Sequence, residues 1–234
     1  MNAGQEAEDV ARATRALGAA GQSDLVWGHV SLRDPAGRGV WMKASGWGFE
    51  EVTPGRVLLV APDSRILAGE GLPHLEAPIH TEIMAARPDV NAVVHTHGRA
   101  AVAFASLDVP LLPLSHDAVP FISPDVPRHP SGRLVSDSRQ GTALARTLGD
   151  AAGCLMVGHG LVAVGADLAS AVMHAVLLDR ACDTQLRAQA AGPVQRWSDA
   201  AEVTQKQEET WSARQLATGY AYLCRSGSSS AGPG

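Results

Sequence analysis

The chain has few cysteines and lacks any long run of apolar or basic residues. Its 234 residues include only three cysteines, which lie far apart and form no C-x-x-C pair. Such a set does not fit a disulfide framework and is typical of a reducing cytosol. No apolar run approaches the roughly 20 residues that span a bilayer, and the first residues do not have the basic, then apolar pattern of a secretory signal. We therefore expect a cytoplasmic protein with no membrane partner.

Clusters of like charge are also missing. The 19 Lys and Arg residues and 24 Asp and Glu residues give a net charge of -5, and no Lys/Arg run occurs. A surface of this kind is not suited to nucleic acid. The hydrophobic content of 45% is ordinary for a globular protein. We expect one domain over residues 1–225 and a disordered tail over residues 226–234, SGSSSAGPG, because that tail has nothing to bury.

The hydrophobic patterns predict interspersed helices and short strands. The predicted helices cover residues 6–17, 77–87, 99–106, 138–148, a long segment capped by Asp167, and 200–223, and Ser138 is the predicted cap of the fourth. The predicted strands cover residues 30–33, 40–44, 57–60, 91–97, 154–157 and 161–164. Residues 110–130 contain six prolines and are expected to be irregular. The pattern favours an α/β fold with a mixed, largely antiparallel sheet covered by helices.

Two histidines, His95 and His97, stand at i and i+2 in the predicted strand 91–97. Alternate side chains of a strand point to the same face, so the two imidazoles can bind one ion. Two histidines on a buried face each need a polar partner, and a shared cation supplies one to both. The alternative is a pair of core histidines satisfied by backbone carbonyls, and a third ligand would distinguish the two.

That third ligand is expected to be His159, which lies between Gly158 and Gly160 at the end of another predicted strand. The glycines allow a tight turn that brings the ring to an ion. Three neutral imidazoles with an open position are typical of a catalytic metal site. Glu76, at the start of the helix 77–87, is interpreted on its own as a carboxylate that interacts with the helix N-terminus.

Taken together, Glu76, the stretch PIHTEIMAARPDVNAVVHTH and the later GHGLVAVG resemble the class II aldolase/adducin family, over about residues 22–178. The resemblance implies a single-domain α/β/α sandwich. It also implies one divalent metal ion per subunit, whether zinc, manganese, cobalt or iron, on His95, His97 and His159. Glu76 would shuttle protons beside that ion. Family members often form ring tetramers with active sites at subunit interfaces, so a homotetramer is expected.

Three segments depart from the sugar-phosphate aldolases of this family. Those members hold phosphate with an S-G-N segment, a T-P-S-G-like turn and a pair of serines before the Glu. The corresponding segments here are Trp27-Gly28-His29, Lys43-Ala44-Ser45-Gly46 and His74-Leu75. Lys43 and a protonated His29 or His74 can each pair with a carboxylate. The other interpretation is that these residues are fillers in an aldolase whose substrate lacks phosphate.

The predicted substrate-binding residues are therefore His29, Lys43, Ser45, Gly46 and His74, with His116 of the proline-rich loop as a further candidate. The remaining histidines, His80, His129 and His174, have no clustered partners in the sequence beyond local contacts.

The same departure favours a small-molecule carboxylate as substrate. The chain resembles the family's dihydroxyphthalate decarboxylases in particular. We predict a divalent-metal-dependent carbon–carbon lyase that decarboxylates a hydroxylated aromatic (di)carboxylate such as 3,4-dihydroxyphthalate. The metal would bind a phenolic oxygen, and Glu76 would protonate the ring carbon that loses the carboxylate. One alternative is an aldolase or epimerase acting on a small non-phosphorylated hydroxy-carbonyl compound, and another is a non-catalytic, adducin-like assembly module.

Overall fold

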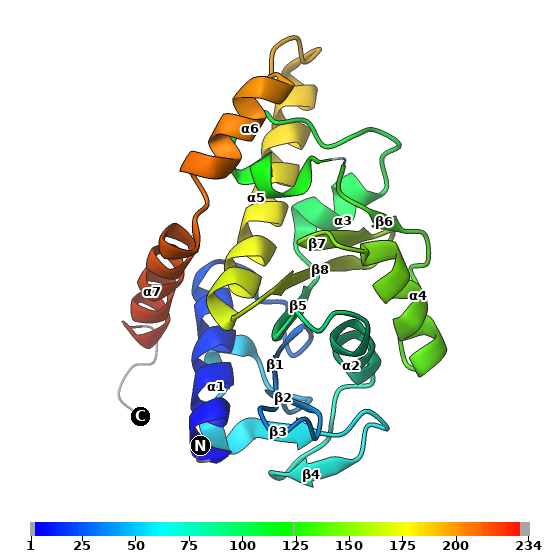
Figure 1. Cartoon of the computed structure of the whole chain (residues 1–234), viewed down its shortest axis with the longest axis vertical. Helices are drawn as coiled ribbons and strands as arrows, with labels where there is room; N and C mark the ends of the chain where they lie inside the picture. Colours follow the sequence, from blue (N-terminus) through cyan, green and yellow to red (C-terminus); the bar gives the residue numbers. More distant parts are fainter. Residues whose placement is uncertain (1–2, 124, 230–234) are drawn as a thin grey trace.

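The computed structural model describes residues 3–123 and 125–229. Across these residues an eight-stranded sheet runs through the centre of the molecule in the order β4-β3-β2-β1-β5-β8-β7-β6 (Figure 1). The strands are β1 His29–Arg33, β2 Val40–Lys43, β3 Val57–Val60, β4 Ile66–Ala68, β5 Ala92–Thr96, β6 Arg128–His129, β7 Gly153–Met156 and β8 Gly160–Gly165. Neighbouring strands pair antiparallel except β6 and β7, which are parallel. The predicted mixed, largely antiparallel sheet is confirmed.

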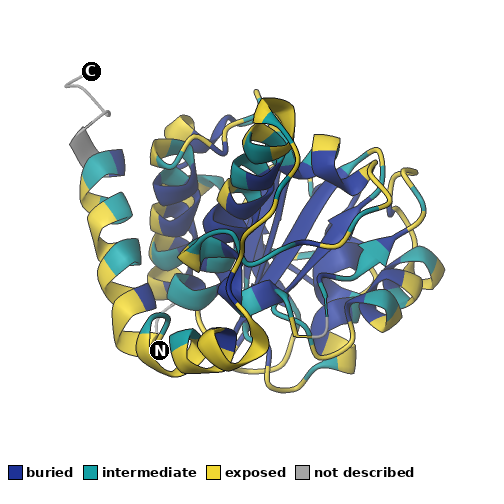
Figure 2. Ribbon diagram, turned by 90° about the horizontal axis from the view of Figure 1, so that it is seen from above, coloured by how far each residue is buried: buried dark blue, intermediate teal, exposed yellow. Residues whose placement is uncertain are grey.

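Helices cover both faces of this sheet. They are α1 Ala3–Ala19, α2 Ala77–Ala86, α3 Arg99–Ala105, α4 Ser138–Leu148, α5 Leu168–Ala191, α6 Ala200–Glu209 and α7 Ala213–Ser229, with short 3-10 turns η1 Phe49–Glu51, η2 Pro54–Arg56 and η3 His116–Phe121. Figure 2 shows the buried sheet between helices whose outer faces are exposed. The α/β/α sandwich that the resemblance implied is therefore present.

The core lies in separate clusters on the two faces of the sheet. The cluster under α2 and α4 includes Met42, Ile83, Val93, Leu144 and Val162, and the one under α1, α3 and α5 includes Leu17, Val94, Phe104, Leu161 and Val172. Successive residues of β5 and β8 alternate between the two clusters, as the pleat of a strand requires. His95, two residues after Val93, is therefore directed to the α2 side.

Several predicted boundaries differ from the structure. Asp137, not Ser138, caps α4, because its carboxylate accepts a hydrogen bond from the backbone N–H of Gln140. Asp167 caps α5 as predicted, through the N–H of Ser170. The predicted helix 200–223 is two helices, α6 and α7, and the proline-rich segment contains η3 and β6.

The C-terminal end also differs from the prediction. Residues 226–229, assigned to a disordered tail, are the last turn of α7. This turn packs closely on α1, where a Cβ added at Gly227 would stand 2.9 Å from the backbone oxygen of Arg15. The rest of the predicted tail, residues 230–234, lies outside the described residues.

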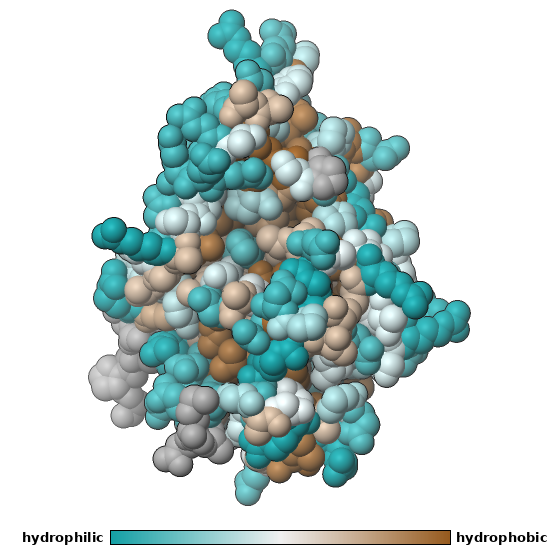
Figure 3. All heavy atoms as spheres, in the orientation of Figure 1, coloured by the Kyte–Doolittle hydropathy of each residue, from teal (hydrophilic) through white to brown (hydrophobic). Residues whose placement is uncertain are grey.

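The surface seen in Figure 3 has hydrophobic side chains in small areas separated by hydrophilic ones. None of the described helices combines the length and the apolar character that crossing a membrane would require.

Candidate metal centre

Four residues predicted for the site converge at one end of the central strands. His95 is the last residue but one of β5, and His97 directly follows that strand. Glu76 precedes α2, and His159 lies in the turn between β7 and β8. The pairing of β5 with β8 brings that turn to the end of β5, where Thr96 is the partner of Leu161. One ligand atom from each of the four side chains lies within 4.8 Å of the others.

The protonation of His95 and His97 follows from their outer hydrogen bonds. Nδ1 of His95 lies 2.9 Å from the carbonyl oxygen of Leu161, and Nδ1 of His97 lies 2.9 Å from Oδ2 of Asp24. Both oxygens can only accept, so each Nδ1 carries the proton and each Nε2 carries a lone pair. The two Nε2 atoms nevertheless lie 3.1 Å apart. Two facing lone pairs repel each other unless a cation stands between them.

The donor set therefore fits a divalent metal. Two imidazole nitrogens that share one tetrahedral zinc at about 2.0–2.1 Å stand about 3.3 Å apart, close to the spacing observed here. The imidazole of His159 is directed toward the same point, with its Nε2 3.4 Å from Oε1 of Glu76. The alternative of two core histidines satisfied only by carbonyls does not fit, since the Nε2 atoms have no such partners.

Glu76 lies among these rings and does not cap α2. Its Oε2 is 3.4 Å from Nε2 of His95, and its Oε1 accepts a 3.0 Å hydrogen bond from the backbone N–H of Val135. No hydrogen bond joins its side chain to the N-terminus of α2. Burial opposes ionisation, but the contacts of the carboxylate with the imidazoles of His159 and His95 and the hydrogen bond from the backbone N–H of Val135 outweigh it and hold the pKa of Glu76 well below its ordinary value. Glu76 is thus a carboxylate at neutral pH.

A cavity of about 510 Å³ opens on this centre. Its lining consists of Trp27, Gly28, His29, Ser45, His74, Leu75, Glu76, His97, Gly132, Leu134, Gly158 and His159. Three of these are large apolar side chains that are at least half exposed, Trp27 (53%), Leu75 (74%) and Leu134 (50%). The polar centre therefore has apolar walls around its entrance.

Lys43 was predicted to bind a substrate carboxylate, and this prediction is wrong. The side chain is fully buried, and Nζ donates to the carbonyl oxygens of Val26 (2.9 Å) and Trp47 (2.8 Å). Its third partner is Nε2 of His74, at 3.1 Å. All three N–H groups of the ammonium are used inside the protein. Burial also lowers the pKa of Lys43 to about 8.

His29 and His74, which were predicted to bind substrate, line the cavity but are not cations. Burial is the main cause that lowers the pKa of His74 to about 3, and the charge of Lys43 adds to it. Burial and the neighbouring imidazoles also hold the pKa of His29 well below its ordinary value. Both rings are therefore neutral, and the expected ion pair between a protonated histidine and a carboxylate is incorrect.

Of the other predicted contacts, Ser45 lines the cavity, whereas Gly46 does not. His116 is exposed in η3, where its carbonyl oxygen accepts a hydrogen bond from Nε1 of Trp211, and it is not part of the cavity wall. The neighbouring Asp117 pairs with Arg180, 3.1 Å away. Residues 115–117 are therefore not placed to contact a substrate in the cavity of this chain.

Three residues that lie in or beside the site were not predicted from the sequence. Asp24 orients His97 and Leu134 forms a wall of the cavity, yet neither stands in a recognisable motif. His80 was interpreted as making only local contacts, although its i, i+4 spacing from Glu76 places both on one face of α2. That spacing was the available signal.

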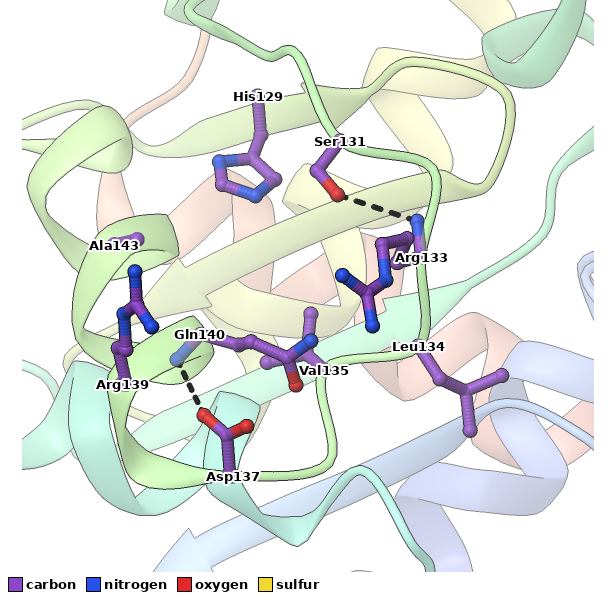
Figure 4. A pocket seen from close by; sticks show the side chains of 9 residues that line it. All are labelled: His129, Ser131, Arg133, Leu134, Val135, Asp137, Arg139, Gln140 and Ala143. Atoms are coloured by element: carbon purple, nitrogen blue, oxygen red, sulfur yellow. Dashed lines mark hydrogen bonds between the residues drawn. The ribbon is translucent and has the colours of Figure 1, made fainter.

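A second cavity of about 380 Å³ lies beside the first, and Leu134 lines both. Figure 4 shows the guanidinium groups of Arg133 and Arg139 at this second cavity, with Asp137 bonded to the backbone of Gln140. The segment 131–135 thus separates the two hollows.

Comparison with known proteins identifies the family. Residues 8–186 match the model of the class II aldolase and adducin N-terminal domain. The chain belongs to the class II aldolase and adducin family. This confirms the resemblance that Glu76, the H-x-H pair and the G-H-G turn indicated.

Individual relatives of this family include lyases of two kinds. The decarboxylase NovR of Streptomyces niveus is 34% identical over 188 residues, which cover 79% of this chain and 70% of the relative. The 3,4-dihydroxyphthalate decarboxylase of Arthrobacter keyseri is 30% identical over 197 residues, which cover 79% of each chain. The solved L-fuculose 1-phosphate aldolase from Glaciozyma antarctica PI12 has a TM-score of 0.86 at 26% identity, covering 98% of this chain and 90% of that one. Relatives of both kinds support an enzyme.

Proposed function

We propose that this protein is a divalent-metal-dependent decarboxylase of hydroxylated aromatic carboxylates, with His95, His97 and His159 as metal ligands. The observation that carries the proposal is the pair of facing Nε2 lone pairs beside Glu76, at the base of a cavity with apolar walls. Zinc, manganese, cobalt and iron all suit such an imidazole site. When bound, the ion supplies a Lewis acid that stabilises negative charge developing on an oxygen.

Glu76 moves the proton in this proposal. As a carboxylate it accepts the proton of a phenolic hydroxyl ortho or para to the departing carboxylate, and then delivers that proton to the ring carbon bearing the carboxylate. The carbon–carbon bond breaks, CO2 leaves, and the electron pair of that bond restores the aromatic ring and leaves a phenolate. Solvent then protonates the phenolate oxygen. The hydrogen bond from Val135 to Oε1 holds Glu76 in place for both transfers.

The neutral surroundings of the cavity support decarboxylation better than the cationic ones predicted from the sequence. A carboxylate loses its charge as CO2 departs, so a cation paired with it would stabilise the ground state more than the transition state. Neutral His29 and His74 avoid that penalty. The apolar side chains of Trp27, Leu75 and Leu134 suit a flat ring and exclude water from the carboxylate.

The experiment is a panel assay on purified protein stripped of metal and reloaded separately with zinc, manganese, cobalt or iron. The compounds are 3,4-dihydroxyphthalate, a hydroxypyridine dicarboxylate, fuculose phosphate and ribulose phosphate, scored for CO2 and for aldehyde. We expect CO2 from a ring acid, lost in His159→Ala and kept in the exposed control His116→Ala. Aldehyde from a sugar phosphate with no CO2 would instead establish the aldolase alternative. A metal-free protein with full activity would overturn the metal assignment.

A further inference from the structure

A series of hydrogen bonds connects Ser31 in the core, through His80, to His29 in the wall of the cavity. Oγ of Ser31 lies 2.6 Å from Nδ1 of His80, and Nε2 of His80 lies 2.6 Å from Nδ1 of His29. Ser31 and His80 are fully buried, and His29 is 2% exposed. The remaining nitrogen of His29, Nε2, lies 3.9 Å from Oε2 of Glu76, and the ring lines the cavity.

Strand and helix periodicities build this chain. His29 and Ser31 stand at i and i+2 on β1, so both side chains point to one face of the sheet. β1 pairs with β5 so that His29 is opposite His95, the predicted metal ligand. On α2, His80 stands one turn after Glu76 and reaches the same face. The hydrogen-bonded series is therefore built on α2, which Glu76 directly precedes, and on β1, the strand paired with the one that carries His95.

Which group donates in each of these hydrogen bonds follows from the groups at the two ends of the series, Ser31 and the Glu76 carboxylate beside His29. Each neutral imidazole has one N–H and one lone pair, so all the bonds in the chain must point the same way. If Ser31 donates to His80, then His80 donates to His29, and His29 keeps its proton on Nε2. If the direction is reversed, Nε2 of His29 carries a lone pair that faces the carboxylate of Glu76. Since a carboxylate only accepts, the first direction is favoured.

We propose that Ser31 and His80 are positioning residues that hold the proton of His29 on Nε2, so that His29 offers a neutral N–H donor to a substrate oxygen in the cavity. The inference rests on the proposed function only in that the substrate carries an oxygen acceptor beside the metal. A neutral donor suits a substrate group whose charge changes during the reaction. It orients that group without placing a permanent positive charge beside it. A purely structural role for His80 would require only that its ring fill space.

The direct test is the tautomer of His29 in the zinc-loaded protein, measured by 15N NMR after selective histidine labelling. We expect the wild-type protein to carry the proton on Nε2 of His29. Ser31→Ala removes the end donor and should shift His29 toward the other tautomer, with kcat on the active ring acid lowered about tenfold, the loss of one hydrogen bond of about 1.4 kcal/mol. Ser31→Thr keeps a hydroxyl and should restore both.

Two replacements of His80 separate positioning from packing. His80→Gln keeps an N–H donor where Nε2 stands, whereas His80→Met fills similar space without one. We expect the Gln variant to retain the tautomer and most of kcat, and the Met variant to lose both. Thr147→Val, which removes the hydroxyl 3.2 Å from Nδ1 of His129 outside the main cavity, is the matched control and should change neither.

A wild-type His29 with its proton on Nδ1 would overturn the inference, as would folded Ser31→Ala and His80→Met variants with unchanged tautomer and kcat. If the variants do not fold, the wild-type spectrum still decides. If no ring acid yields CO2, the proposed function fails while the tautomer measurement still tests the inference.

Discussion

Asp24 and His97 are joined by a 2.9 Å hydrogen bond between Oδ2 and Nδ1, although 73 residues separate them in the chain. The bond selects the tautomer of His97 that leaves Nε2 free to bind an ion, and it raises the basicity of the ring.

The first prediction follows from this pair. Asp24→Ala should weaken metal affinity by about 10- to 100-fold, the usual effect of removing a carboxylate behind a histidine ligand. Competition with a chelator of known affinity measures the change. Asp63→Ala, at an exposed carboxylate that pairs with Arg65, is the control and should leave the affinity unchanged. Equal affinities in the two variants would show that Asp24 does not orient His97 for the metal.

The second prediction separates Glu76 from the metal ligands. Glu76→Gln keeps an oxygen that can accept from Val135 but cannot carry a proton, so fold and metal content should persist while turnover falls by about 10²- to 10⁴-fold. Metal analysis and steady-state kinetics on the same preparation provide the two readouts. Glu82→Gln, on the helix α2 that follows Glu76, replaces a carboxylate that accepts a hydrogen bond from Thr142 and is the matched control. Undiminished turnover in Glu76→Gln would remove Glu76 from the proton transfer.

The sequence could predict the positions of those site residues that stand in a local sequence pattern. The i, i+2 spacing of His95 and His97 places both rings at one strand end, and the glycines around His159 permit its turn, so local geometry alone indicates a shared site. The largely antiparallel sheet followed from short strands separated by turn residues. The family resemblance then placed Glu76 beside the three rings.

The charge states of the cavity could not be predicted in the same way. Lys43 was expected to face a substrate because it stands in the segment that corresponds to the phosphate-holding turn of the sugar-phosphate aldolases, and because an ammonium can pair with a carboxylate. Its burial depends on the carbonyl oxygens of Val26 and Trp47, which only tertiary folding brings together. The neutrality of His74 depends in turn on that burial and on Lys43. Desolvation is a property of the folded environment and leaves no local pattern in the chain.

The third prediction concerns Lys43 in its observed role. Lys43→Met should leave two buried carbonyl oxygens and His74 without their donor, and should lower the free energy of unfolding by about 2–4 kcal/mol. Urea denaturation measures this loss. The Michaelis constant of the variant, assayed below its unfolding range, should change little because the ammonium does not reach the cavity. A large rise in KM with unchanged stability would restore the original prediction of substrate binding.

The fourth prediction is a dependence of stability on pH from Asp34. Hydrogen bonds from Arg38, together with one from Nε1 of Trp41, lower the pKa of Asp34 from 3.8 to about 2. The unfolded chain therefore binds this proton at higher pH than the folded chain does. The stabilisation is complete above about pH 4 and is lost as the pH falls through about 2. Asp34→Asn should be less stable at pH 6, and the difference from wild type should shrink at pH 2 in urea titrations.

The last prediction is that the protein assembles, as the homotetramer that the family resemblance implied, with closed symmetry. Four large apolar residues are exposed on the segments that form or adjoin the cavity entrance, namely Leu25 (72%), Trp27 (53%), Leu72 (73%) and Leu75 (74%). Apolar side chains gathered at one place on a surface are typical of an interface. A neighbouring subunit over this entrance would cover them and close the cavity to water.

Light scattering at micromolar concentration measures the assembly. Leu75→Asp should shift the protein toward smaller species and lower activity together, since a charge at a covered apolar site costs association free energy. Leu67→Asp, on β4 away from the cavity, is the matched control and should keep both the assembly and the activity. If the wild-type protein is a monomer and remains active, the cavity entrance is complete within one chain. The exposed leucines would then serve substrate binding, and Leu75→Asp would raise KM without changing the mass of the particle.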